Sequence, residues 1–215
     1  MPQLLHDTLL ILDFDHTLFN TTKLVQTEAD YFRETFGIPE SAFRETREQV
    51  KICCVVEDID RFVQLLPHPN KTAMHEAILS VIRTAAPHCL FPDVLPSLDI
   101  LKRKADILLA THGDPELQEA KIRSSGIPTE FPFAITQTKK SEIIANHTDD
   151  YATILLVDDK PENLREVKAR FPSVRTCLIM RSDDHPYSNS TVPYSSIDHI
   201  IENLTNLTLG THGIA

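Results

Sequence analysis

Residues 8–17, TLLILDFDHT, decide the fold, because an apolar run leads directly into Asp13, Asp15 and Thr17. A run that is continuously apolar, rather than alternating, is typical of a strand covered on both faces, as in a parallel sheet. Similar runs recur at residues 105–110, 153–157 and 174–180, with a shorter and weaker one at 133–136. The sequence therefore predicts a parallel sheet whose first strand ends among acidic residues.

Helix-like segments separate the later strands, at residues 92–104, 115–124, 141–147 and 161–170. Pro115 and Pro161 stand where two of these helices begin, which is a position that proline favours. Strands that alternate with helices indicate an open, doubly wound α/β sheet. Residues 181–196, rich in Ser, Asn, Asp and Pro, predict a surface loop, and residues 197–207 predict a last helix.

Residues 20–88 interrupt this alternation. Apart from a short run at 52–56 they contain no strand-like stretch, and their apolar spacing predicts helices at 22–36, 40–51, 58–66 and 72–86. We therefore expect an all-helical insertion, the predicted cap, at residues 20–88. The α/β core would consist of residues 1–19 and 89–215.

The composition limits the function classes. The chain has 215 residues, 41% of them hydrophobic, so a packed core is expected and extensive disorder is not. Its 21 basic and 31 acidic residues give a net charge of −10, which argues against nucleic acid or a membrane surface as the main partner. No apolar run is long enough to span a membrane, the N-terminus lacks the basic start of a secretory signal, and the four cysteines form no C-x-x-C pair. We expect a cytoplasmic protein with buried thiols, either a monomer or a weak dimer.

Polar residues follow the predicted strands where each strand ends. In an open α/β sheet ligands bind at the carboxyl ends of the strands, so residues far apart in the sequence meet there. A cluster of acidic residues is electrostatically costly unless it holds a cation, and oxygen ligands favour a hard ion such as Mg²⁺. The candidate residues are Asp13, Asp15 and Thr17 after the first strand, Thr111, His112 and Gly113 after the second, Asp158 and Asp159 after the strand at 153–157, and Lys139 or Lys140 at a helix start.

With these motifs the chain resembles the haloacid dehalogenase superfamily of hydrolases. The D-x-D-x-T at residues 13–17 matches the first family motif, Thr111 stands at the second, and the acidic pair at 158–159 stands at the fourth. For the third motif, a lysine at a helix start, Lys140 fits better than Lys139, because Lys140 opens an apolar helical turn.

The resemblance covers the whole chain in the right order, and many members carry a cap where residues 20–88 stand. The chain departs from the family pattern at His16, where glycine is commoner. It also departs in its adjacent Asp158-Asp159 pair, where other members space the two acidic residues further apart.

The resemblance implies a role for each candidate residue. Asp13 would be the nucleophile that forms an aspartyl-phosphate, and Asp15 the general acid and base. Because a halide leaves without a proton, the dehalogenase branch lacks this second aspartate, so Asp15 favours phosphoryl transfer. Lys140 would neutralise phosphoryl charge, and Thr17, Thr111, His112 and Gly113 would bind substrate. The implied Mg²⁺ ligands are Asp13, the main-chain carbonyl of Asp15, Asp159 and, directly or through water, Asp158.

The function implied is Mg²⁺-dependent hydrolysis of a small phosphomonoester metabolite, which an enclosing cap would shield from bulk water. Two alternatives remain: a phosphotransferase or mutase of the same superfamily, and a non-catalytic binding protein on the same fold. Basic residues of the predicted cap stand as solvated helix faces, with one or two of them reaching the substrate: Arg33, Arg44, Arg47, Lys51 and Arg61.

Overall fold

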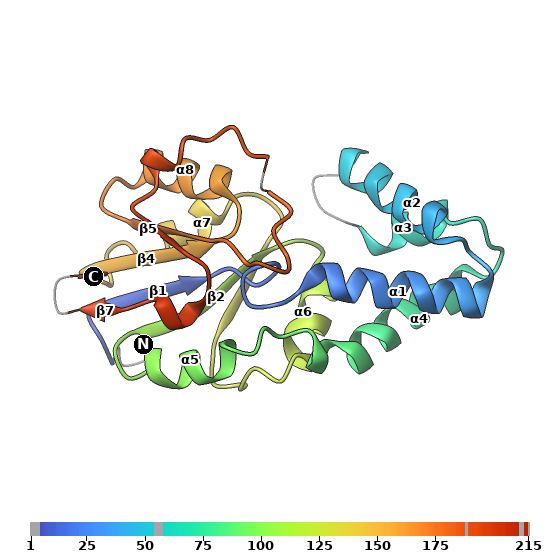
Figure 1. Ribbon diagram of the computed structural model, residues 1–215, viewed down its shortest axis with the longest axis horizontal. Helices are drawn as coiled ribbons and strands as arrows, with labels where there is room; N and C mark the ends of the chain where they lie inside the picture. The colour runs from blue at the N-terminus through green and yellow to red at the C-terminus, as the bar shows by residue number, and fades with distance from the viewer. Residues whose placement is uncertain (1–4, 54–57, 188, 211–212, 215) are drawn as a thin grey trace.

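A six-stranded parallel sheet forms the centre of the molecule (Figure 1). The structure is a computed structural model, and it describes residues 5–53, 58–187, 189–210 and 213–214. The strand order is β3-β2-β1-β4-β5-β6, so β1 lies between β2 and β4. The predicted doubly wound α/β sheet is confirmed. Strands β1 to β5 lie within two residues, at either end, of the five apolar runs at 8–14, 105–110, 133–136, 153–157 and 174–180. The strands are β1 (Thr8–Leu12), β2 (Asp106–His112), β3 (Phe133–Thr136), β4 (Thr153–Asp158), β5 (Arg175–Ile179) and β6 (His199–Ile201).

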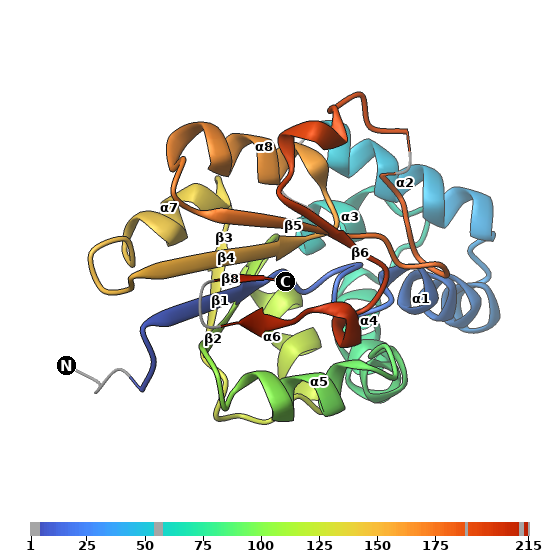
Figure 2. The ribbon, with the colours of Figure 1, turned by 60° about the vertical axis from the view of Figure 1, so that its left-hand side comes forward.

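Helices cover both faces of the sheet, which explains why the strands are continuously apolar. Along β1, Leu10 and Leu12 belong to the core on one face, and Leu9 and Ile11 to the core on the other. Helices α5 (Val94–Leu101) and α6 (Pro115–Ser124) cover the first face, and α7 (Lys140–Ala145) and α8 (Pro161–Arg170) cover the second (Figure 2).

A helical insertion stands between β1 and the helix α5 that precedes β2. Its aromatic core joins three helices: Phe32 packs on Phe43 with ring centroids 5.2 Å apart, and Phe43 packs on Phe62 at 5.0 Å. These rings belong to the same hydrophobic core as Leu10 and Leu12 of β1, so the insertion and the sheet share one continuous core. The insertion lies beyond the carboxyl ends of the strands (Figure 1). It consists of α1 (Thr21–Phe36), α2 (Glu40–Cys53), α3 (Ile59–Leu65), α4 (Lys71–Ala85) and a 3-10 turn, η1 (Ala86–His88).

The predicted insertion after β1 is therefore confirmed, while its assignment to residues 20–88 as a separate domain stays a prediction. Of the strand-like run at 52–56, Ile52 lies in α2, and residues 54–57 lie outside the described part of the chain.

The helix predicted at residues 197–207 is wrong. This stretch contains β6, which pairs in parallel with β5 at the edge of the sheet, and a 3-10 turn, η3 (Leu204–Asn206). A further 3-10 turn, η2 (Tyr194–Ser196), precedes β6, and two short antiparallel strands follow, β7 (Leu209–Gly210) and β8 (Gly213–Ile214). The buried residues have helix-like spacing by coincidence, because the chain changes from strand to turn between them: Ile197, Ile201, Leu204 and Leu207.

The loop predicted at residues 181–196 is not wholly on the surface. Arg181 is 5% exposed and Asp184 is 3% exposed. The Arg181 guanidinium donates to the main-chain oxygen of Thr17 over 2.9 and 2.7 Å, and it pairs with Asp93 at 2.8 Å. The loop after β5 is thereby fixed against the loop after β1, where the candidate site begins.

Two further expectations concern membrane-spanning segments and the cysteines. None of the helices among the described residues is long and apolar enough to cross a lipid bilayer. Cys89 and Cys177 are buried free thiols, as expected, whereas the side chains of Cys53 and Cys54 lie outside the described part of the chain.

Candidate active site

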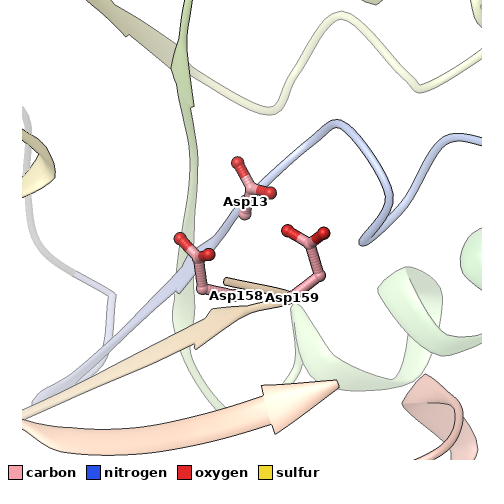
Figure 3. Close-up of side chains that lie close together, drawn as sticks. All are labelled: Asp13, Asp158 and Asp159. Atoms are coloured by element: carbon pink, nitrogen blue, oxygen red, sulfur yellow. The ribbon is translucent and has the colours of Figure 1, made fainter. Parts of the chain in front are cut away.

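Three aspartates lie together beyond the carboxyl ends of β1 and β4 (Figure 3). Asp13 follows β1, and Asp158 and Asp159 end and follow β4. All three are buried, and one carboxylate oxygen from each lies within 4.8 Å of the others. The amide of Asp13 donates to the oxygen of Val157 over 2.9 Å, so the hydrogen-bond ladder between β1 and β4 extends to the site itself. Such a buried group of carboxylates could hold a metal ion.

Lys140, the first residue of α7, reaches into this acidic centre. Its ammonium donates to Asp13 Oδ1 and to Asp158 Oδ2, and its side chain is 4% exposed. The side chain of Lys139 is 67% exposed, and its ammonium lies 3.9 Å from Glu166. The structure thus brings Lys140, and not Lys139, to the three aspartates.

The two adjacent aspartates make different contacts. Asp158 accepts from Lys140, from the main-chain amide of Lys160 at 2.8 Å and from the side-chain amide of Asn163 at 3.2 Å. Asp159 Oδ2 has no hydrogen-bond partner among the described residues. Asp158 is therefore placed to orient Lys140, while Asp159 has an oxygen available for a ligand.

Negative charge exceeds positive charge at this centre. Burial, together with the charge of Asp158, raises the pKa of Asp13 to about 6 even though Lys140 opposes the change. Burial and the charges of Asp13 and Asp158 raise the pKa of Asp159 well above its ordinary value. The single positive charge of Lys140 is therefore not enough to balance the three carboxyl groups. The all-oxygen donor set and the unpartnered Asp159 oxygen fit a hard divalent cation.

One residue after β1 and one near the end of β2 add hydroxyl groups beside the centre. Thr17 is fully buried and donates to Asp13 Oδ2 over 3.2 Å. Thr111, in β2, is 1% exposed, and its hydroxyl has no partner in the described part of the chain. A buried hydroxyl without a partner is unusual and indicates a missing ligand or water.

The absence of a side chain at Gly113 leaves space for Gln118. A Cβ at this position would lie 2.5 Å from Nε2 of Gln118, so any larger residue would displace Gln118. Gln118 also donates to the main-chain oxygen of His112 over 3.3 Å. Burial and the nearby Lys140 lower the pKa of His112, which favours a neutral imidazole.

Asp15 is held by contacts that the sequence analysis did not foresee. Its carboxylate accepts from Thr21 at 2.6 Å, from Gln118 at 2.8 Å, and from Lys121 at 2.6 and 2.7 Å. Despite burial, the charges of Lys121 and His16 and these hydrogen bonds keep the pKa of Asp15 well below its ordinary value. Asp15 is thus a carboxylate here, paired with Lys121.

His16 connects the site to the insertion. Its backbone is in the left-handed region, with φ +59, a conformation that favours glycine. Its Nδ1 lies 2.7 Å from Asp184, which also accepts from the Thr22 hydroxyl at 2.6 Å. The first two residues of α1, Thr21 and Thr22, therefore each bind a carboxylate of the core, Asp15 and Asp184 respectively.

A cavity of about 770 Å³ lies between the insertion and the core. Asp15, His112 and Gly113 line it, whereas Asp13 does not. Most of its apolar wall belongs to the insertion and comprises Leu24, Val25, Ile59, Phe62, Ile78 and Ile82, with Leu117 of α6 on the core side. Of the basic residues considered above, Arg44, Arg47 and Lys51 line the cavity, whereas Arg33 and Arg61 are not among its lining residues. Arg47 lies 3.4 Å from the buried Glu28, another lining residue.

The fold and the buried acidic centre place the protein among the α/β proteins whose functional sites lie at the carboxyl ends of parallel strands. Residues 8–177 match the haloacid dehalogenase-like hydrolases, and the chain belongs to that family of enzymes. No curated protein matches the sequence.

Solved structures share the whole architecture. A haloacid dehalogenase-like hydrolase from Burkholderia xenovorans superposes with a TM-score of 0.78 at 18% identity, over 94% of both chains. The HAD-hydrolase YfnB from Bacillus subtilis, bound to magnesium, gives 0.67 at 15% identity, over 93% of this chain and 96% of YfnB. CbbY from Rhodobacter sphaeroides, in complex with phosphate, gives 0.58 at 15% identity, over 91% and 94%. Other similar structures are 2-haloacid dehalogenases. At such identities the likeness establishes the fold and not the activity.

Proposed function

We propose that the protein is a Mg²⁺-dependent phosphatase that hydrolyses a small phosphomonoester through an aspartyl-phosphate on Asp13. The observation that carries the proposal is the carboxylate of Asp15 in the cavity wall, two residues after Asp13. A leaving alkoxide needs a proton, which such a residue can deliver, whereas a leaving halide needs none. The magnesium-bound YfnB and the phosphate complex of CbbY, two structures of the same fold, support the choice.

The chain's own residues can perform both half-reactions. Asp15, which is an ionised carboxylate paired with Lys121, must first leave Lys121 and take up a proton from water. A carboxylate oxygen of Asp13 then attacks phosphorus, the ester P–O bond breaks, and Asp15 gives that proton to the departing alkoxide oxygen. Water then attacks the aspartyl-phosphate, Asp15 takes the proton of that water, and inorganic phosphate leaves with the Asp13 carboxylate restored. Lys140 and the Thr111 hydroxyl would bind the phosphoryl oxygens.

The metal would be held by Asp13, the main-chain carbonyl of Asp15 and Asp159, with Asp158 orienting Lys140. Bound there, Mg²⁺ supplies positive charge that lets one anion approach another. A cavity of about 770 Å³ suits a metabolite rather than a folded protein. The cytoplasmic location and the monomeric or weakly dimeric state belong to the same proposal.

The test is release of inorganic phosphate from a panel of phosphomonoesters with Mg²⁺, with 2-haloacids and halide release as the second arm. We expect phosphate release that chelation of divalent ions abolishes reversibly, and no turnover by Asp13→Asn. Phosphate that appears on an added acceptor instead of in water would indicate a phosphotransferase. Near-normal turnover by Asp13→Asn would refute the proposal.

A further inference from the structure

The loop after β5 places an aromatic residue, Tyr187, in the wall of the cavity opposite the insertion. The family motifs do not include this loop. It is anchored at Arg181, which is bound to Thr17 and Asp93, and at Asp184, which is bound to Thr22. Because both anchors are buried, the position of Tyr187 is set by the core.

Two side chains from the other walls contact the ring of Tyr187. The ammonium of Lys160 lies 5.2 Å from the ring centroid, over its face. The imidazole of His16 meets the ring edge-on, with centroids 6.3 Å apart. Since Lys160 directly follows Asp159, and His16 directly follows Asp15, the ring stands beside the acidic centre.

The charges that act on the phenol come from the same centre. Burial and then the carboxylates of Asp159, Asp13, Asp158 and Asp15 raise the pKa of Tyr187 far above its ordinary value. A phenol that keeps its proton here can donate a hydrogen bond to an anion.

We propose that Tyr187 binds the phosphoryl group. Its hydroxyl donates a hydrogen bond to a phosphoryl oxygen, both of the substrate and of inorganic phosphate. The Lys160 ammonium, which lies over the face of the ring, adds positive charge. This inference rests on the proposed phosphatase function, and it adds a substrate-binding residue outside the four family motifs. The phosphoryl group is common to all phosphomonoesters, so Tyr187 acts on every substrate alike.

Tyr187→Phe tests the proposal, because it removes the hydroxyl and keeps the ring. Tyr194→Phe is the matched control, because Tyr194 packs against the other face of the sheet and does not line the cavity. Binding of inorganic phosphate to the Mg²⁺-loaded protein is measured by calorimetry. A hydrogen bond to a charged group corresponds to about a ten- to hundredfold change in affinity, so the phosphate Kd of Tyr187→Phe should rise by that factor. Mg²⁺ binding without phosphate should be unchanged in both variants.

Tyrosine fluorescence gives an independent readout, because the chain has four tyrosines and no tryptophan. Phosphate should change the emission of the natural protein and of Tyr194→Phe, and change it far less in Tyr187→Phe. In turnover, Tyr187→Phe should lose the same factor in kcat/KM with alkyl and with aryl phosphates.

Phosphate binding by Tyr187→Phe equal to that of Tyr194→Phe would overturn the role of Tyr187 and leave the phosphatase proposal intact. A loss confined to one leaving group would also overturn it. A natural protein that neither binds nor releases phosphate would overturn both proposals.

Discussion

Removal of divalent ions makes the stability of the protein depend on the protonation of Asp13. Burial raises the pKa of Asp13 from an ordinary value of 3.8 to about 6 in the folded state. Between these values the folded protein holds a proton that the unfolded chain has lost, so the free energy of unfolding falls as the pH rises. About two pH units at about 1.4 kcal/mol per unit give a loss of about 3 kcal/mol.

Two neighbouring carboxyl groups also affect how the free energy of unfolding changes with pH in this range. The raised pKa of Asp159 acts in the same direction as that of Asp13. The lowered pKa of Asp15 acts in the opposite direction, because ionised Asp15 stabilises the folded state. This stabilisation is complete above the pKa that Asp15 has in the unfolded chain, and it is lost only as the pH falls through the pKa that Asp15 has in the folded protein. Asp15 therefore contributes little change between pH 4 and 6.

The assay is urea unfolding followed by circular dichroism in a chelating buffer, at half-unit steps from pH 4 to 7. The natural protein is compared with Asp13→Asn, whose side chain does not titrate. The difference in unfolding free energy between the two should fall by about 3 kcal/mol as the pH rises to 6. Saturating Mg²⁺ should stabilise the natural protein increasingly with pH, because the metal binds the deprotonated carboxylates. Parallel pH curves for the two proteins would refute a protonated Asp13 in the metal-free centre.

Three further outcomes are expected. Asp15→Asn should slow phosphoenzyme formation by about a hundred- to ten-thousandfold from an alkyl phosphate, and far less from p-nitrophenyl phosphate, in single-turnover bursts; equal losses would deny Asp15 the role of proton donor. Arg181→Met should lower the unfolding free energy measured in urea by about 3–5 kcal/mol, because it leaves the Asp93 carboxylate without its buried partner, and a loss below about 1 kcal/mol, as for a surface pair, would contradict this. Arg47 lies in the cavity wall, so Arg47→Met should change the ratio of kcat/KM values between phosphomonoesters. Arg33 is an exposed residue of α1 outside the lining, and Arg33→Met should leave that ratio unchanged. The same loss on every substrate would exclude a role of Arg47 in specificity.

The central strands could be predicted because their burial leaves a direct mark in the sequence. Every residue from Leu9 to Leu12 faces one of two cores, so the run is apolar without interruption. Strand β6 leaves no such mark, because it has three residues at an edge of the sheet, and Ile200 is 47% exposed. Its flanking buried residues mimic a helical period, so the pattern favoured a helix that the chain does not form.

Some residues of the candidate site could likewise be predicted from the sequence, and others could not. Asp13, Thr111 and Asp158 could be placed near one another, because the ends of parallel strands meet at one edge. Gln118 and Lys121 could not, since their contact with Asp15 depends on the rotation of α6. Their spacing of three residues is consistent with one helix face, but the sequence does not say which face turns toward β1. The position of Tyr187 depends on the path of the loop after β5, and the spacing of apolar residues does not predict the path of a loop.

The central position of β1 has a consequence for amide hydrogen exchange. Both edges of β1 are hydrogen-bonded, to β2 and to β4, and the ladder continues to the amide of Asp13. Its amides are bonded alternately to the two neighbours, and each can exchange with solvent only when the strand that it binds separates from the centre of the sheet, an opening close to complete unfolding. Helices of the insertion need no such event, because their amides are bonded within each helix. We therefore expect the acidic centre to lie in the slowest-exchanging part of the chain, so its carboxylates should keep their spacing even when amides of the insertion exchange.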